Sequence, residues 1–505
     1  MSNKKKYNVL LITSDQQHFD TIGKFNKEIK TPNLDRLCES GTCFDRAYTV
    51  NPTCTPARAS IITGKYPSQH GAWTLGTKLD ENCTTIGELM QKEGIKTSLI
   101  GKAHFQPLES NDTYPSLEAY PTLQDIEFWK TFDKDFYGFE DVKLARNHTN
   151  ESHVGQNYVA WLKENGCDNY KDYFLPPTGN MDINQKYIWD IPEKYHYDKW
   201  IAEETNNKLE EYSKNGKQFF CWASFFDPHP QYLVPKNWAN MYDSESLTLP
   251  KLVEGELLNA TDLHKLTQEE NPDFSKYSDS GWAIHGCHSQ LKNEKEAKKE
   301  LAIYYSMVSL MDKYIGKILD KLDELNLTEN TLIVFTTDHG NFMGQHGLYE
   351  KGPAVYEDAI KIPFIASLKG VIKENVVNSS LQSLVDLPIT FLDYCNLSIP
   401  FDFTGVNQRL VWEGKKEKAR EHIICEHNHE RNLINMRVYV NKRYKLVIYY
   451  NNKHGELYDL VNDPNELNNL WDKEEYSKLQ KELMLKYMWA ELEKESLFMP
   501  RIAHA

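Results

Sequence analysis

One short segment of this chain places a nucleophile and a cation one helical turn apart. It reads Cys54-Thr55-Pro56-Ala57-Arg58 and continues to a turn at Thr63-Gly64. Pro56 and Arg58 suit the first turn of a helix, where backbone N–H groups and the helix dipole attract anions. A thiol and a guanidinium arranged in this way could act on a tetrahedral oxyanion.

Polar pairs also follow several apolar runs that have the character of buried strands. Asp15-Gln16 and Asp338-His339 each come directly after such a run, as do Lys102-Ala103-His104 and Asp227–His229. Strands alternate with helical patterns, which predicts a largely parallel sheet whose reactive residues meet at the carboxyl ends of its strands. Four reactive clusters at one edge of one sheet predict a hydrolytic site with a metal ion.

With these motifs the sequence resembles the type I sulfatases of the alkaline phosphatase superfamily. Their signature is Cys/Ser-x-Pro-x-Arg followed by a Thr-Gly turn, which Cys54–Gly64 matches. The resemblance implies that a maturation enzyme oxidises Cys54 to formylglycine, whose hydrated aldehyde then attacks a sulfate ester. The similar segments are Asn8–Asp15, Thr31–Cys38, Cys54–Gly71, Gly101–His104, Ser224–Pro230, Thr337–Gly352 and Arg443–Leu470.

The resemblance also implies a role for each polar residue around the nucleophile. Arg58 would hold the anionic form of the nucleophile, and Lys102 would contact the sulfate and formylglycine oxygens. His104 would take the proton from the second hydroxyl of the hydrated aldehyde. His229 would act as general acid to the leaving alkoxide, together with Lys351. We further expect His70 to support the site and His148 and His153 to lie in exposed loops.

The metal ligands implied by the resemblance are Asp15, Gln16, Asp338 and His339, with the nucleophile at Cys54. A set of mainly oxygen donors suits Ca²⁺, which is the simplest assignment. Two positions depart from the common pattern, because many sulfatases have Asp in place of Gln16 and Asn in place of His339. A nitrogen donor and one negative charge fewer make Mn²⁺ the alternative.

The same two departures occur in the phosphonate monoester hydrolases of the superfamily. Hydrolysis of a phosphonate monoester or phosphodiester is therefore the alternative activity, although Lys102 and His104 favour the sulfatase. A protein that binds anions without turnover is a third alternative, which the complete set of nucleophile, acid and base candidates disfavours. We predict an enzyme that hydrolyses the sulfate monoester of a small compound, such as a sulfated sugar.

Composition narrows the location and the partners. The net charge is −15 and no basic run extends beyond Lys4-Lys5-Lys6, so nucleic acid is not an expected partner. No run approaches the roughly 18 apolar residues of a membrane span, and no apolar leader precedes the first strand, which predicts a cytoplasmic protein without membrane association. Nine cysteines without CxxC spacing predict free thiols. A homo-oligomer remains open.

These patterns predict an α/β fold like that of alkaline phosphatase, with a mostly parallel sheet between helices in residues 1–395. Residues 396–505 should form a smaller subdomain, an antiparallel sheet with a terminal helix. We expect the aromatic-rich segment Phe105–Pro192 to wall the cleft. The main candidates are strands at Asn8–Thr13, Thr97–Ile100, Phe219–Ser224, Thr331–Thr336 and Ile362–Ala366, and helices at Gly87–Glu93, Asp198–Tyr212, Glu294–Leu325 and Glu474–Ser496.

Overall fold

The computed structural model describes residues 6–146, 153–174, 186–250, 252–277, 285–352, 354–430, 433–495 and 502–503. His148 lies outside these residues, so its predicted position in an exposed loop stays a prediction. None of the helices in the described ranges is both long and apolar enough to cross a bilayer.

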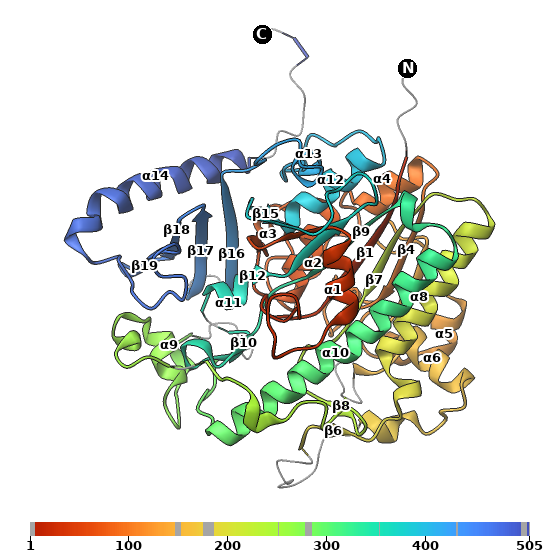
Figure 1. Ribbon diagram of the computed structural model, residues 1–505, viewed down its shortest axis with the longest axis horizontal. Helices are drawn as coiled ribbons and strands as arrows, with labels where there is room; N and C mark the ends of the chain where they lie inside the picture. The colour runs from red at the N-terminus through yellow and green to blue at the C-terminus, as the bar shows by residue number, and fades with distance from the viewer. Residues whose placement is uncertain are drawn as a thin grey trace.

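A central sheet of eight strands organises the molecule (Figure 1). β1 lies between β7 and β9, and β4 and β5 continue the sheet beyond β7, all in parallel pairing. β13 runs antiparallel to both β9 and β2. In sheet order the strands are β14 (Val376–Asn378), β2 (Thr42–Phe44), β13 (Phe364–Ser367), β9 (Thr331–Thr337), β1 (Asn8–Ser14), β7 (Phe219–Ser224), β4 (Lys96–Gly101) and β5 (Asp141–Leu144).

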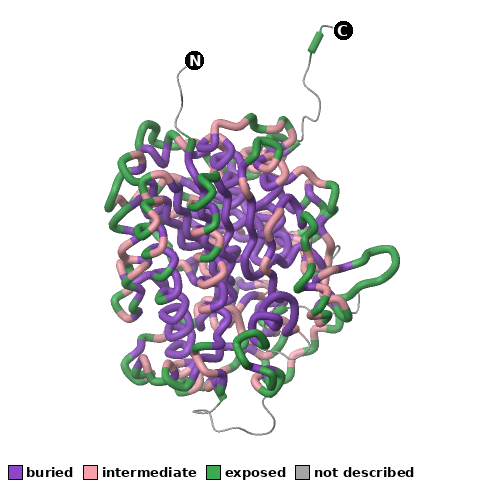
Figure 2. Tube along the Cα trace, turned by 90° about the vertical axis from the view of Figure 1, so that its right-hand side faces the viewer, coloured by how far each residue is buried: buried purple, intermediate pink, exposed green. Residues whose placement is uncertain are grey.

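Helices cover both faces of this sheet, because its central strands are apolar on both sides. Leu10 and Ile12 of β1 pack into one core with α1 (Pro32–Glu39), α6 (Gln156–Glu164), α8 (Tyr197–Lys214) and α10 (Glu294–Glu324). Val9 and Leu11 pack into the other core with α2 (Cys54–Thr63), α4 (Ile86–Lys92) and α12 (Leu387–Tyr394). Buried residues fill the middle of the molecule in Figure 2. The predicted layered α/β architecture is confirmed.

The predicted strand at Ile362–Ala366 is in fact two strands. Pro363 separates β12 (Lys361–Ile362) from β13, and the two belong to different sheets. A proline has no N–H to donate to a ladder, so it marks the point where the chain leaves one sheet for the next. β12 pairs with β3 (Ala47–Tyr48), which also pairs with β15 (Gln382–Ser383).

The last part of the chain forms the expected antiparallel sheet with a helix against it. The sheet contains β16 (His422–Glu430), β17 (Ile434–Asn441), β18 (Tyr444–Tyr449) and β19 (Gly455–Asp459), in that order. The side chain of Asn441 closes the turn after β17 by accepting the N–H groups of Arg443 and Tyr444. α14 (Ser477–Glu493) packs on one face. The boundary between residues 395 and 396 stays a prediction.

Four large aromatic residues of the segment Phe105–Pro192 lie in the core, whereas Tyr114 and Tyr120 are more than half exposed. Trp129, Tyr158, Trp161 and Trp189 are each at most 8% exposed and pack against the helices that flank the sheet. These four buried rings are therefore closed to a ligand, and the prediction that the segment walls the cleft stays a prediction. The remaining short elements include α3 (Pro67–His70), α5 (Ile126–Thr131), α9 (Asp262–Thr267), α11 (Glu357–Ile360), α13 (Arg409–Trp412), β6 (Ile188–Trp189), β8 (Val234–Pro235), β10 (Phe342–Met343) and β11 (Tyr349–Glu350).

Candidate active site

Cys54 is fixed at the first position of a helix that is buried along its whole length. All ten residues of α2 are buried, and Cys54 is 1% exposed. Asn51 holds the turn before the helix. Its Oδ1 accepts the backbone N–H of Thr53 at 2.8 Å and the side-chain hydroxyl of Thr53 at 2.6 Å. The thiol therefore sits beside free backbone N–H groups, which favour an anion there.

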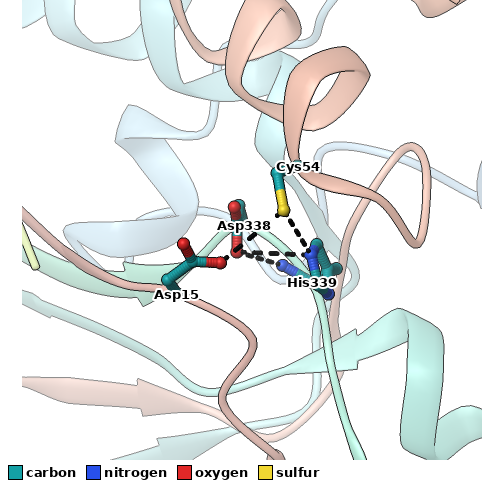
Figure 3. A group of neighbouring side chains, drawn as sticks. All are labelled: Asp15, Cys54, Asp338 and His339. Atoms are coloured by element: carbon teal, nitrogen blue, oxygen red, sulfur yellow. Dashed lines mark hydrogen bonds and ion pairs between the residues drawn. The ribbon is translucent and has the colours of Figure 1, made fainter. Parts of the chain in front are cut away.

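Four potential ligands of a metal ion meet at this thiol (Figure 3). Asp15, Cys54, Asp338 and His339 each offer one ligand atom, and these atoms lie within 4.8 Å of one another. The Cys54 sulfur is 3.2 Å from Nε2 of His339 and 3.7 Å from Oδ1 of Asp15. Two strand ends and one helix start supply them: Asp15 follows β1, Asp338 and His339 follow β9, and Cys54 begins α2.

Gln16, the fifth predicted ligand, has an oxygen that fits the same group. Its backbone N–H donates to Oδ1 of Asp338 at 3.1 Å, and its Nε2 donates to Oδ1 of Asn341 at 2.7 Å. Its Oε1 is buried without a hydrogen-bond donor among the described residues. Since a buried acceptor without a donor is costly, this atom suits a cation. The donor set of carboxylates, amide oxygen and imidazole fits a divalent metal ion.

Cations surround the two carboxylates. Lys102 contacts Oδ2 of Asp15, and Arg58 donates from Nε to Oδ2 of Asp338 at 2.8 Å. Both cations are fully buried. Burial opposes ionisation of Asp15, yet Lys102, Arg58 and Lys351 lower its pKa to about 2. The carboxylate of Asp15 is therefore held as an anion by buried cations that water does not screen.

The main chain places Lys102 by a close approach of two strands. Gly101 has φ +105°, and a Cβ atom there would lie 1.9 Å from the carbonyl oxygen of Ser224. Only glycine fits this position, so β4 and β7 end side by side. Arg58 bridges the same two strand ends, donating to the carbonyl oxygen of Lys102 at 2.9 Å and to Oγ of Ser224 at 2.8 Å.

Lys351 reaches the nucleophile from another side of the site. Its Nζ lies 3.3 Å from the Cys54 sulfur and 2.9 Å from Nε2 of His229. Burial raises the pKa of the Cys54 thiol, but Lys102 and Lys351 outweigh burial, and the net pKa is below its ordinary value. The position thus favours an anionic nucleophile.

The proton shared by Lys351 and His229 rests on the lysine. Burial and the charge of Lys351 lower the pKa of His229 well below its ordinary value. Burial also disfavours the charged form of Lys351, but Cys54 and Asp15 raise its pKa overall. An ammonium group that donates to an imidazole at 2.9 Å is a suitable proton source for a leaving group.

His104 stands on a loop that a buried ion pair holds in place. The N–H groups of His104, Phe105 and Gln106 all donate to the carboxylate of Glu118, at 2.9 to 3.0 Å. Arg146 pairs with the same carboxylate at 2.6 Å. His104 itself has φ 60°, as does Gln16, so both residues hold a backbone conformation that side chains normally avoid.

No pattern in the sequence indicated Glu118 and Arg146. Nor did any pattern indicate a buried polar cluster near His229 in the chain, formed by Asp227 with His196 and Asp198. Asp227 accepts the N–H of Asp15 on its carbonyl oxygen at 3.2 Å, and its carboxyl group lies in a buried cluster with His196 and Asp198. Burial raises the pKa of Asp227 to about 7. Asp227 was recognised only as a residue at a strand end. No motif marked the other residues, because their partners are far away in the sequence.

His70, which we expected to support the site, and His346, eight residues after Asp338, both have buried partners. His70 is 3.0 Å from Oγ of Ser60 on the nucleophile helix. His346 is 3.2 Å from Oε1 of Glu256 and stacks on Tyr356 with 3.7 Å between ring centroids. His70 therefore braces α2, and His346 braces the loop that leads to Lys351.

Comparison with known families places this geometry in context. The family model described as Sulfatase matches residues 7–397, and the model described as N-sulphoglucosamine sulphohydrolase, C-terminal, matches residues 344–494. The arylsulfatase of Clostridium perfringens is 29% identical over 490 residues, which cover 93% of this chain and 91% of that protein. The N-acetylglucosamine-6-O-sulfatase of Bacteroides thetaiotaomicron is 26% identical and covers 95% of this chain and 85% of its own length.

Solved structures share the fold. The phosphonate monoester hydrolase of Silicibacter pomeroyi superposes with a TM-score of 0.81 at 22% identity, covering 99% of this chain and 98% of its own. A protein solved with its substrate D-glucosamine-2-N,6-O-disulfate superposes with a TM-score of 0.72 at 20% identity, covering 97% and 98%. Because both sequence identities are low, these two likenesses show a shared fold and nothing more.

Proposed function

This chain belongs to the sulfatase family and is a sulfatase, a hydrolase of sulfate esters, and from that premise we propose that its nucleophile is formylglycine made from Cys54. The observation that carries the proposal is the position of the Cys54 sulfur, 3.2 Å from His339 and 3.3 Å from Lys351. When formed, the hydrated aldehyde supplies a hydroxyl for attack on sulfur. A maturation enzyme is then a transient partner.

Asp15, Gln16, Asp338 and His339 would hold a divalent metal ion, with the group at position 54 as a further ligand. The ion would be Ca²⁺, with Mn²⁺ as the alternative because of His339. When bound, it supplies positive charge next to the sulfate oxygens and the nucleophile. The buried Oε1 of Gln16 and the carboxylate of Asp15, which carries its negative charge at neutral pH, support this assignment.

The remaining residues bind the anion and move protons. Arg58 holds Asp338 and strengthens the positive potential at the start of α2. Lys102 and Lys351 place ammonium groups on two sides of the nucleophile. Lys351, through His229, would protonate the leaving alkoxide, and His104 would accept a proton from the hydrated aldehyde. His229 is partly exposed, which lets the alcohol portion of the ester leave on that side.

We propose that the substrate is the sulfate ester of a small compound such as a sulfated sugar. Support comes from relatives whose names specify sulfated sugars, among them the N-acetylglucosamine-6-O-sulfatase. All nine cysteines are free thiols, which supports a location in the reducing cytoplasm.

A second activity is favoured by two residues. Gln16 and His339 are also typical of phosphonate monoester hydrolases, so hydrolysis of a phosphonate monoester or phosphodiester is the alternative. The pair Lys102 and His104 favours sulfate over phosphonate as the substrate group. Lys102 contacts Asp15, and the backbone N–H of His104 donates to Glu118.

The test is the ratio of rates on matched aryl sulfate and aryl phosphonate monoesters, with Cys54→Ala as the blank for each. This ratio does not depend on the fraction of Cys54 that has been converted. A ratio well above one supports the sulfatase assignment. A ratio below one would assign the site to phosphonates, and residual activity in Cys54→Ala would remove the nucleophile. Mass spectrometry of the peptide that contains position 54 tests the conversion separately.

A further inference from the structure

The terminal helix α14 is apolar on two opposite sides. On one side, Leu483 and Ala490 are buried against the C-terminal sheet. The other side faces away from the molecule, at the outer edge in Figure 1. Five large apolar side chains on that side are between 38% and 61% exposed: Met484, Leu485, Met488, Trp489 and Leu492. A contiguous exposed stripe of this kind is typical of an interaction surface.

The stripe is continuous along the helix because its residues recur at helical spacing. Met484, Met488 and Leu492 are four residues apart and lie on one line, and Leu485 and Trp489 lie beside them. An isolated exposed leucine is ordinary, but five such residues on one helix face leave a large apolar area in water. We call these five residues the α14 stripe.

Charge at the two ends of the α14 stripe is of opposite sign. Lys481 lies on the same face towards the start of the helix, and Glu495 lies on it just past the end. Both are exposed, and neither takes part in an ion pair within the part of the chain that the structure describes. The two residues are equally far from Met488, seven positions before and seven after.

We propose that the α14 stripe binds a second copy of this chain, with the two α14 helices antiparallel about a two-fold axis at Met488. In that arrangement Met488 meets its own copy, and Met484 meets Leu492, which lies four residues on the other side of Met488. Lys481 of each chain then faces Glu495 of the other. The interface is isologous, since one surface pairs with itself. Opposite charges at the ends favour the antiparallel over the parallel orientation.

A groove beside the helix enlarges the interface. It has a volume of about 470 Å³ and is lined by Trp489 and Lys486 of α14 and by Tyr439 and Arg443 of the adjacent sheet. A stable interface buries about 1,200 Å² or more in total, which exceeds what one helix face provides. Trp489 belongs to the α14 stripe and also lines the groove, and tryptophan is among the residue types that most often anchor such contacts.

The first experiment is the molar mass of the full-length protein by light scattering during gel filtration, over a range of concentrations. We expect twice the chain mass of 58.8 kDa at micromolar concentration. Met488→Lys places two ammonium groups at the axis and should weaken the dimer about 100-fold. Val377→Lys, on the edge strand β14 of the central sheet and 49% exposed, is the matched control and should stay dimeric.

A charge exchange tests the orientation. Lys481→Glu and Glu495→Lys each place like charges together and should weaken the dimer, whereas the double variant should restore it. A wild-type protein that stays at the mass of one chain, or a Met488→Lys variant that stays dimeric, would overturn the proposal. A double variant no more dimeric than its parents would overturn the antiparallel pairing. Aryl sulfatase activity reports that each variant is folded, because α14 contributes nothing to the catalytic site.

Discussion

At the scale of single residues, the site is dominated by buried charges in contact with one another. Arg58 and Lys102 are balanced by Asp338 and Asp15, and Lys351 contacts the sulfur of Cys54 and the ring of His229. Removing one partner of a buried pair leaves an uncompensated charge, which costs about 3–5 kcal/mol. Substitutions here therefore change both stability and chemistry, so each activity measurement needs a matching measurement of folding.

His229→Ala should affect substrates according to how good their leaving group is. If Lys351 and His229 deliver a proton to the leaving oxygen, alkyl sulfates should slow by about 10²–10⁴-fold. Aryl sulfates with acidic phenols leave without protonation and should slow far less. The measurement is kcat/KM over a series of phenols and alcohols. Equal losses across the series would show that His229 only shapes the site.

His70→Gln should alter the pH dependence of stability. Burial lowers the pKa of His70 to about 4, while in the unfolded chain it is near 6.5. The folded state binds fewer protons between these values, so wild-type stability is lost as pH falls through this window.

His70→Gln has no imidazole to protonate, so it lacks this loss of stability at low pH. Between pH 7 and pH 5, its free energy of unfolding should fall by about 2 kcal/mol less than that of the wild type. Urea unfolding at the two pH values measures the difference. Identical slopes for both proteins would show that His70 already binds a proton in the folded state.

The sequence predicted the residues that carry local signatures and missed those that do not. Cys54 and Arg58 stand within one motif, and Asp15 and Asp338 directly follow apolar runs, so type and position were both visible. Glu118 and Arg146 lie 28 residues apart in an irregular stretch and meet only in the folded chain. Their pairing depends on tertiary structure, which no local pattern encodes.

At the scale of elements, the site lies at the edge of the central sheet where several parallel strands end. β1, β4, β7 and β9 are neighbours in parallel register, so Asp15, Lys102, Asp227 and Asp338 emerge side by side. The strand predictions were accurate here because each central strand is a short, continuous apolar run. They failed at Pro363, where one apolar run supplies two sheets. The long helix α10 was predicted at Glu294–Leu325 and runs from Glu294 to Glu324.

Glu118→Gln should impair catalysis from a distance. The carboxylate receives three backbone N–H groups of the loop that carries His104, and it balances the buried Arg146. The amide leaves that guanidinium unpaired, so we expect a loss of about 3 kcal/mol in the free energy of unfolding and a lower kcat.

Bound metal should stay unchanged in this variant, because Glu118 is not among the proposed ligands. Elemental analysis checks that point. The double variant Glu118→Gln with Arg146→Met removes both charges and should recover part of the stability. A single variant with normal stability would mean that the ion pair does not hold the loop.

At the scale of the whole molecule, the C-terminal sheet is joined to the catalytic part by buried polar contacts. Glu426 of β16 accepts the N–H and the hydroxyl of Ser68, each at 2.7 Å, and pairs with Lys494. Its N–H donates to the carbonyl oxygen of Val50, four residues before Cys54. Glu426 thus forms a polar junction between the two parts of the chain beside the nucleophile helix.

Lys494→Met should destabilise the protein strongly. It leaves the fully buried carboxylate of Glu426 without its cation, at a cost of about 3–5 kcal/mol. Lys486→Met, near the same end of the chain, breaks a more exposed pair with Glu482 and should cost less than about 1 kcal/mol. Chemical denaturation compares the two variants. Equal effects would mean that the junction contributes little to stability.

The burial of Cys54 sets an order of events in the life of each molecule. With 1% of its surface exposed and its helix enclosed by the sheet, the thiol is out of reach of any protein-sized reagent once the chain has folded. If Cys54 is converted to formylglycine, as we propose, the converting enzyme must therefore act while the chain is still unfolded. On this proposal, chains that fold before conversion would keep the thiol, so the relative rates of modification and folding would fix the proportion of active molecules.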